Sequence, residues 1–584
     1  MSAFADFLVT FGAAASAPPK RRSDEPWRPA GAMAGAWNAL LAAGPASTLV
    51  RTRDVRPWSV WMLGELTRYD SLSAPADPLG AFALDLRMGR EQPTLLDGHF
   101  LMLAWNAESR EWHVWTDRFG TMHAYHGTAG GRSAIGTFHP AVSQCVGASR
   151  LDWAGLNGFF AMGFFPEDRT HFEEVRILRP ATHHVFTDRG ELRRAERYWM
   201  WAHSPESGLR FDEAVERFGA TLGAVVGDET AQGRIAVPVS GGLDSRTVAA
   251  LATGGERDRL WLYSYGYGAG SIETRIARRV ASARGMRCEC FEIGEYLFDR
   301  MDDVLAATEG FNDVTQTRQV AVSAALGEHA ESVMAAHWGD VWCDTGGTGV
   351  GDTGAGVAAG KFLKEGRRWL LENIVAPRLG GDPERTVREA VGREFERVPE
   401  MDDGDFRLKA LKTDTWSFRW TVTGVRAFQL GAFPRLPFYD SRMSELFCTL
   451  PSEFVTGRRL QVEWLKRFAP DLAGVTWQAS GASLTLPAFA RPLLLPGRAL
   501  RKAWRLATGA TVIERNWEVQ FLSERGRVRL RESLLRPGLH LHEFVAPATI
   551  AALLDAFFAR PLEEKRGYTV SMLLTFSAWL ERYA

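Results

Sequence analysis

Cysteine is scarce in this sequence, and long hydrophobic runs are missing altogether. The 584 residues include five cysteines, an odd and sparse set that excludes a disulfide framework. We interpret them as free thiols in a reducing compartment. No stretch of about 18 apolar residues occurs, so the sequence predicts no membrane span. The apolar stretch 1–17 is followed, not preceded, by Lys20-Arg21-Arg22, an order that does not fit a secretory signal. We therefore expect a cytoplasmic protein.

The chain also lacks an excess of charge of either sign. Lys and Arg number 69, and Asp and Glu number 70, which gives a formal net charge of −1. Such a balance gives no support for a nucleic-acid partner or for an anionic membrane surface. Hydrophobic residues make up 46% of the sequence, which is enough for sizeable cores. At roughly 100–200 residues per domain, the length predicts two to four domains.

Residues 1 to about 205 have the pattern of strands in an antiparallel layer. Short apolar runs alternate with turn formers such as Asn106 and Gly190, a spacing typical of a β-sandwich. The expected strands include 99–105, 112–116, 134–138 and 182–187.

After Tyr198-Trp199 the pattern changes to helices that alternate with short buried strands. This alternation predicts a parallel sheet wound in βαβ units. Pro238 removes a ladder donor, so we expect it at a bulge or near a strand end. From about residue 365 the chain is mainly helical. The expected strands are 235–239, 260–265, 288–293 and 332–336, and the expected helices are 211–226, 243–252, 272–284, 387–395, 443–450, 460–468 and 568–583.

A Ser-Gly-Gly-Leu-Asp-Ser string joins the first of these strands to its helix. Two glycines let the backbone turn sharply and bring N–H groups close to an anion, and the helix directs its positive dipole end toward that anion. The serines add hydroxyl donors, and the Asp carboxylate can hold Mg²⁺ against phosphates. We therefore expect a phosphate-binding loop for ATP, formed by Val239, Ser240, Gly241, Gly242, Leu243, Asp244 and Ser245.

A second candidate is His337-Trp338-Gly339-Asp340, after the fourth expected strand. Carboxylates at the carboxyl ends of parallel strands point into the crevice where open α/β sheets bind ligands. We therefore expect Asp244 and Asp340 to form the catalytic pair that holds Mg²⁺, with His337, Gly339 and Tyr265 beside the nucleotide. Alternatively Asp340 only caps a turn, and Tyr265 only fills the core. Asp344 is the fallback metal ligand.

One near-match is set aside. Gly356 to Lys361 resembles a Walker A loop, but it has three residues between its glycines where four are needed, and Phe362 replaces Ser or Thr. We expect a flexible loop there, within the Gly-rich stretch 346–360.

The 240–245 string is similar to the pyrophosphate-loop signature of the asparagine synthetase superfamily. Residues 96–100 and 117–120 resemble the "GxF … RDxxG" core of the family's N-terminal glutaminase-like domain, and 151–199 resembles its passage into the synthetase domain. Arg435 to Asp440 resembles the "RxPFxD" motif. The resemblance implies a mixed α/β and α+β fold, with an antiparallel, sandwich-type glutaminase-like domain at 1–205 and a parallel α/β synthetase domain with a helical C-terminal part at 206–584.

The sequence departs from the family pattern in both of the expected domains. Working glutaminase domains of this family have a catalytic cysteine directly after Met, whereas residue 2 is Ser here and no cysteine precedes Cys145. The family's Glu before the "PFxD" motif is replaced by Phe433. Its late Arg-x-Lys motif, whose Lys steadies the acyl-adenylate, is absent from the stretch 475–478, and Lys466-Arg467 nearby is not aligned. We expect no release of ammonia from glutamine.

The resemblance is closest to the family's lasso-peptide cyclases. Such an enzyme uses ATP and Mg²⁺ to adenylate an Asp or Glu side chain of a precursor peptide, and the peptide's N-terminal amine then closes a macrolactam ring. The expected partner is that peptide, and a leader-peptide-binding protein and a leader protease are further candidates. A small-molecule amide synthetase of the asparagine synthetase or β-lactam synthetase type is the alternative, and a catalytically silent binding protein is a third possibility.

Overall fold

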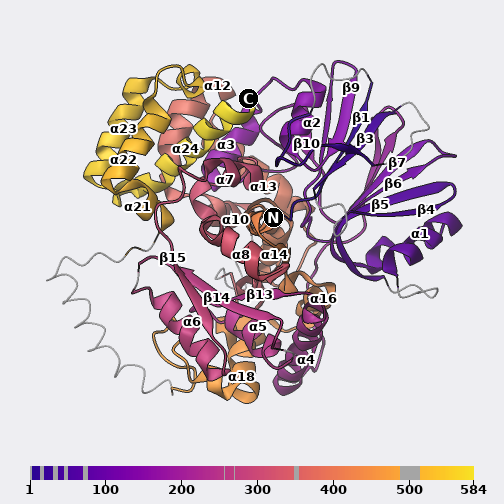
Figure 1. Ribbon diagram of the computed structural model, residues 1–584, viewed down its shortest axis with the longest axis vertical. Coiled ribbons are helices and arrows are strands. Elements are labelled where there is room, and N and C mark those ends of the chain that lie inside the picture. Colours follow the sequence, from indigo (N-terminus) through magenta and orange to yellow (C-terminus); the bar gives the residue numbers. More distant parts are fainter. Residues whose placement is uncertain are drawn as a thin grey trace.

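The computed structural model contains two antiparallel sheets, one parallel sheet and a helical C-terminal part (Figure 1). None of the helices described is long and apolar enough to cross a membrane. The residues that the structure describes are 3–12, 19–30, 37–44, 50–69, 77–255, 257–268, 270–346, 354–486, 513 and 515–584.

The two antiparallel sheets confirm the expected sandwich-type layer. Their strand orders are β10-β8-β9-β1-β3-β2 and β12-β11-β7-β6-β5-β4. The strands are β1 (Asp6–Phe11), β2 (Arg28–Pro29), β3 (Trp37–Ala43), β4 (Val50–Val55), β5 (Trp58–Tyr69), β6 (Leu96–Asn106), β7 (Glu111–Thr116), β8 (Tyr125–Ala129), β9 (Arg132–Gly136), β10 (Val175–Ile177), β11 (Thr182–Thr187) and β12 (Leu192–Arg197).

Alternation along β6 explains how this layer is built. Leu101, Leu103 and Trp105 share one buried cluster with Phe7 and Val9 of β1, which lies in the other sheet. Phe100 and Met102 point to the opposite face, where they pack with α1 (Pro78–Met88). Because successive side chains of a strand alternate between faces, the unbroken apolar run from Phe100 to Trp105 buries both faces of its sheet.

The parallel sheet has the order β15-β14-β13-β16-β17, and all its pairs are parallel. Pro238 is the last residue of β13, as expected, and its neighbour Val239 resumes the ladder by donating to the Tyr263 carbonyl. The strands are β13 (Ile235–Pro238), β14 (Leu260–Gly266), β15 (Cys288–Glu292), β16 (Ser332–Met334) and β17 (Phe433–Arg435). The helices α4 (Phe211–Thr230), α5 (Asp244–Ala252) and α6 (Ile272–Ala283) alternate with these strands. The sequence did not predict β17.

The C-terminal part is helical, as expected. Its longest continuous helix joins α14 (Gly404–Lys412), the π-helix η6 (Thr413–Thr421) and α15 (Val422–Val425). Other helices of this part are α13 (Pro383–Arg397), α16 (Ser441–Thr449), α18 (Arg459–Phe468), α21 (Asn516–Phe521), α22 (Glu524–Leu535), α23 (Pro547–Ala559) and α24 (Arg566–Tyr583).

The prediction of a flexible loop at 356–361 is wrong, because these residues form the helix α10 (Ala355–Phe362). Ala358, Ala359 and Phe362 are buried on one side of it, and α10 packs against α13. This tertiary contact outweighs the low helix propensity of the two glycines. Residues 347–353 of the expected flexible stretch lie outside the described residues, as does Ser2.

Candidate functional site

The Ser-Gly-Gly-Leu-Asp-Ser segment forms a tight turn between β13 and α5. The hydroxyls of Ser240 and Ser245 lie 2.8 Å apart, and the Ser240 N–H donates to the Ser245 hydroxyl at 3.0 Å. The Gly242 N–H donates to the Ser240 hydroxyl at 3.2 Å. Backbone N–H groups and hydroxyls therefore converge at the N-terminal end of α5, where the helix dipole favours an anion.

Gly241 faces a segment that arrives from far along the chain. A Cβ at this position would stand 2.1 Å from Oε1 of Gln478, and the Gln478 N–H donates to the Gly241 carbonyl at 3.1 Å. The buried Arg246 of α5 holds the same segment by donating to the carbonyls of Val475 and Thr476, each at 2.8 Å. The stretch 475–478, which lacks the family's lysine, thus lies directly against the loop.

Asp244 is the carboxylate of this loop, and it contacts α18 and the residue just before that helix. Its Oδ1 accepts from Arg458 Nη1 at 2.9 Å and from Gln461 Nε2 at 3.0 Å. Burial raises the pKa of Asp244 to about 6, against the opposing effect of the Arg458 charge, and Asp340 raises it further. The Asp244 carboxyl therefore changes charge close to neutral pH.

The turn after β16 packs on this carboxylate. Trp338 has a φ of 75°, a left-handed conformation that is uncommon outside glycine and is often found at functional sites. Asp340 is exposed, and none of the described residues hydrogen-bonds or pairs with its carboxylate. Burial lowers the pKa of His337 to about 4, so its imidazole is neutral at pH 7. Asp344 instead accepts from the N–H of Gly457 at 2.9 Å.

A cavity of about 590 Å³ brings the loop and this turn together. Of the predicted site residues, those that line it are Val239, Ser240, Gly242, Asp244, Ser245, Tyr265, His337 and Asp340. Three others lie behind the lining: Gly241 against Gln478, Leu243 in the core, and Gly339 against Asp244. The volume is within the range of small-molecule sites.

The sequence did not point to two cations that line the same cavity, Arg318 and Lys412. Lys412 ends α14 and is half-buried, and burial lowers the pKa of its amine. Lys466 of α18, by contrast, is exposed and is not part of this lining. Lys412 precedes Trp416 and Trp420 at intervals of four residues, a pattern that could have marked one helix face.

Three carboxylates line the cavity in which Mg²⁺ would lie with phosphates, those of Asp244, Glu273 and Asp340. In the described part of the chain, no group of three or more His, Cys, Asp or Glu side chains is placed to hold a metal by itself. Mg²⁺ usually takes one or two protein carboxylates and completes its shell with phosphates and waters. Asp340, free of described partners, and Asp244 beside the loop fit that requirement.

The "RxPFxD" motif supports the site and does not line it. The Trp342 indole donates to the Phe438 carbonyl at 2.8 Å, which fixes the turn after β16. Arg435 pairs with Glu65 of β5 at 2.9 Å, and Asp440 accepts from the Arg442 N–H as the N-cap of α16.

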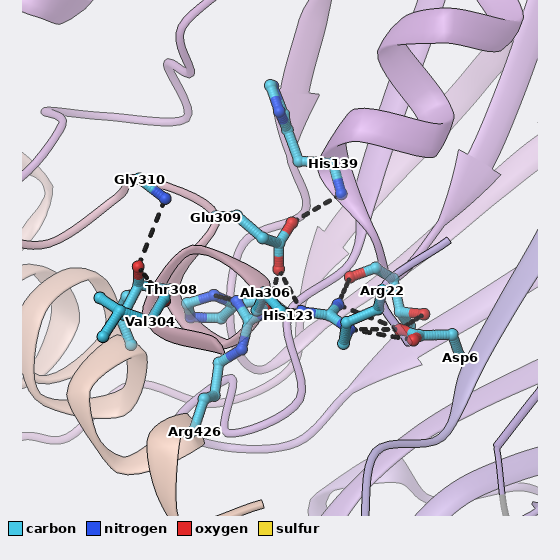
Figure 2. A network of polar contacts seen from close by, with 12 residues as sticks. Asp6, Arg22, His123, His139, Val304, Ala306, Thr308, Glu309, Gly310 and Arg426 are labelled. Atoms are coloured by element: carbon cyan, nitrogen blue, oxygen red, sulfur yellow. Dashed lines mark hydrogen bonds and ion pairs between the residues drawn. The ribbon is translucent and has the colours of Figure 1, made fainter. Parts of the chain in front are cut away.

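A buried polar network joins the N-terminal region to the end of α7 and to η7 (Arg426–Leu430) (Figure 2). Glu309, at the end of α7 (Met301–Thr308), accepts from Arg22 at 2.9 Å, from the His139 N–H at 2.6 Å, and from Arg426. Arg22 also pairs with Asp6 at 2.9 Å. Two acids and two arginines balance, as buried charges require.

Two family models match the chain. A glutamine amidotransferase domain matches residues 80–199, and asparagine synthase matches residues 221–340. No curated protein matches the sequence.

Solved structures similar to the chain include the allosteric regulatory enzyme of purine biosynthesis, at 14% identity and a TM-score of 0.19, over 35% of this chain and 47% of that one. Another is the glutamine phosphoribosylpyrophosphate (PRPP) amidotransferase from B. subtilis complexed with ADP and GMP, at 14% identity and a TM-score of 0.18, over 46% of this chain and 54% of that one. The chain thus spans about half the length of these structures, and TM-scores this low carry no conclusion about its fold.

The two family matches follow one another, the first ending two residues beyond β12 and the second covering β13 to β16 with the loop. For residues 221–340, the match to asparagine synthase indicates an ATP-dependent synthetase that forms amide bonds. Over residues 80–199 and 221–340, these matches confirm the resemblance to the asparagine synthetase superfamily seen in the sequence.

Proposed function

We propose that the protein closes a macrolactam ring in a ribosomal precursor peptide. The observation that carries this proposal is the extent of the site: the cavity at the loop shares Arg318, Trp416 and Trp420 with a neighbouring cavity of about 690 Å³. The first volume suits a nucleotide, and the second, which is somewhat larger, suits a substrate larger than a free amino acid. A small-molecule amide synthetase would leave this second space without a role.

The properties of Cys145 support the proposal that the attacking amine comes from the substrate itself and not from glutamine. Cys145 of α2 (His139–Val146) is the first cysteine of the sequence; it is buried, and burial raises the pKa of its thiol to about 11. A thiol of that pKa is protonated at neutral pH and is a poor nucleophile. We further propose residues 1–205 as a glutaminase-like domain with no glutaminase activity, and residues 206–584 as the synthetase domain.

In the proposed reaction the carboxylate of an Asp or Glu side chain attacks the α-phosphorus of ATP, and the bond to the β-phosphate breaks to release pyrophosphate. The peptide's amine then attacks the acyl carbon, the C–N bond forms, a proton leaves the nitrogen, and AMP departs. The loop at 240–245 would hold the leaving pyrophosphate, while Arg318 and Lys412 face the same space with positive charge. Mg²⁺ would be held by Asp244 and Asp340 and would neutralise phosphate charge. Positioning and charge stabilisation supply most of the rate in such steps.

The test combines the purified protein with ATP, Mg²⁺ and the peptide encoded beside its gene. We expect AMP and pyrophosphate only when the peptide is present, and a peptide product lighter by one water. A leader-binding protein and a leader protease would be added if the peptide alone is inert. Release of AMP with free Asp or a short β-amino acid, while the peptide stays unchanged, would favour the small-molecule synthetase. A protein that binds the peptide without any ATP turnover would instead be a binding protein.

A further inference from the structure

The second cavity has walls of a distinct chemistry. Trp416 and Trp420 belong to both cavities, and Trp517 and Tyr568 line the second one alone. The charged residues that line it are Asp313, Arg318, Lys364, Glu365, Arg515 and Lys565. Aromatic faces beside charged groups are typical of sites that bind side chains by stacking and by cation contacts.

The shared wall comes from one irregular helix. Lys412, Trp416 and Trp420 follow one another at intervals of four along α14 and η6. A π-helix closes each turn one residue later than an α-helix, so residues four apart remain close to one face. Such segments are rare and are frequent at functional sites. The helix therefore presents two indoles to the space where the two cavities meet, and one lysine to the loop cavity.

The acids of the second cavity are already engaged, whereas two of its cations have no ion-pair partner among the described carboxylates, although Arg318 hydrogen-bonds to Tyr267. The Asp313 carboxylate accepts from Thr315 Oγ1 at 2.8 Å and from Ser571 Oγ at 2.7 Å, and Glu365 pairs with Lys565 at 3.5 Å.

The Lys364 amine lies 4.6 Å from the centroid of the Trp416 ring, and Arg318 lies 6.0 Å from that of Tyr265. No carboxylate in the described part of the chain forms an ion pair with either cation. The cavity can therefore accept negative charge from a ligand.

We propose that this second cavity is the subsite for the peptide segment between the amine and the activated carboxylate, and that it takes segments with an acidic side chain and aromatic or apolar neighbours. The proposal rests on the peptide substrate proposed above. Arg318, common to both cavities, would contact the substrate carboxylate where the segment passes to the nucleotide. Lys364 would contact a further acidic or backbone oxygen, and the indoles would stack on the segment.

The test uses a library of synthetic decapeptides, each with a free N-terminal amine and one Asp, Glu, Lys or Arg among apolar and aromatic residues. Retention by the full-length protein is measured by affinity selection and mass spectrometry, and nucleotide binding is measured separately with α,β-methylene-ATP. Gln316→Trp fills the cavity from an exposed position that lines the second cavity only. Lys364→Glu reverses one charge, Lys364→Arg preserves it, and Lys466→Glu is the matched control on the exposed face of α18.

We expect wild-type protein to retain acidic library members, and Gln316→Trp to weaken that retention about tenfold or more, the effect of losing roughly 1.4 kcal/mol of contacts. Lys364→Glu should shift the preference to basic members, while Lys364→Arg and Lys466→Glu keep it acidic. Binding of α,β-methylene-ATP should stay within about twofold in every variant, because these positions do not line the loop cavity.

Failure of this proposal can be told apart from failure of the proposed function. Retention by Gln316→Trp equal to wild type, or no retention of any peptide by wild type, would overturn the subsite. Selective retention that is lost in Gln316→Trp, without loss of water from any peptide when ATP is added, would support the subsite and count against ring closure.

Discussion

Gly339 lies against Asp244 so closely that a Cβ at position 339 would stand 2.8 Å from the Asp244 Cγ and 2.8 Å from the Phe438 ring. The turn after β16 thus packs directly on the loop carboxylate, and only a hydrogen fits between them. The relative placement of Asp244 and Asp340 depends on this contact.

We expect Gly339→Ala to lower ATP-dependent AMP formation about tenfold or more, because the methyl group must displace Asp244 or the turn that carries Asp340. Gly356→Ala is the matched control, since it lies in α10 with no atom within 4 Å of the new Cβ. That change should leave activity unaltered and stabilise the protein by about 0.5–1 kcal/mol. Equal activity of Gly339→Ala and wild type, measured by AMP release, would contradict the role given to this contact.

The two carboxylates of the site should each be essential for adenylation. Asp244→Asn and Asp340→Asn keep the size of the side chain and remove its charge, so we expect AMP formation to fall about a hundredfold or more in each. Asp344→Asn should retain most activity, because Asp344 is engaged with Gly457. Circular dichroism and gel filtration check that the variants are folded. Substantial AMP release by Asp340→Asn with none by Asp344→Asn would transfer the metal role to Asp344.

The pKa of Asp244 predicts a loss of activity in mild acid. With a pKa of about 6 in place of 3.8, the carboxyl gains a proton as the pH falls through 6, and its hold on phosphate-bound metal is lost. The acid limb of kcat/KM should therefore fall near pH 6, since this profile reports the free enzyme. Arg458→Met removes a charge that lowers this pKa, so the limb should move to higher pH. An unchanged limb in Arg458→Met would assign it to another group.

The same raised pKa has a consequence for stability. The folded state binds the Asp244 proton more tightly than the unfolded chain does, so stability from this group increases as the pH falls from about 6 to 3.8. The gain is at most about 1.4 kcal/mol for each pH unit, and Asp244→Asn should not show it.

The sequence predicted the elements whose local pattern agrees with their final packing. The apolar run from Phe100 to Trp105 indicated a strand, and both faces of β6 are buried there. Leu260 to Tyr265 was predicted as a strand, and β14 is Leu260–Gly266. The predicted loop between β13 and α5 has its own glycines and hydroxyls, so its shape is encoded within a few residues.

What the sequence could not predict depends on contacts between distant segments. Lys412 and Arg318 reach the same cavity from positions far apart in the chain, and a lysine on a helix is usually a solvated residue. The strand β17 has only three residues, one of them Pro434, and it is held by pairing with β16. The partners of Glu309 come from three different segments, which no local pattern records.

The Glu309 network should contribute strongly to stability. Glu309→Gln would leave Arg22 and Arg426 buried with one acid fewer, so we expect a loss of about 3–5 kcal/mol in the free energy of unfolding. Arg22→Met in the Glu309→Gln background should cost less than the sum of the two single changes, because it removes one of the unpaired charges. Urea denaturation measures all three variants. Strict additivity would show that the contacts in Figure 2 are not energetically coupled.

Lys412 should act on the chemical step more than on nucleotide binding. Its amine faces the same cavity as Asp340 and the loop, and the stretch 475–478 that lies on the loop offers no lysine. We expect Lys412→Met to lower kcat about a hundredfold, the effect of losing one preorganised charge in an active site, with the KM for ATP changed by less than about threefold. Lys412→Arg should recover part of kcat, because it keeps the charge with a different geometry.

The control for Lys412 is Lys466→Met, on the exposed face of α18. Lys409→Met is not suitable, since the Lys409 amine donates to the Asp344 carbonyl at 2.9 Å. A rise in the KM for ATP with kcat intact would make Lys412 a nucleotide-binding residue and leave Arg318 as the cation that faces the reacting carboxylate.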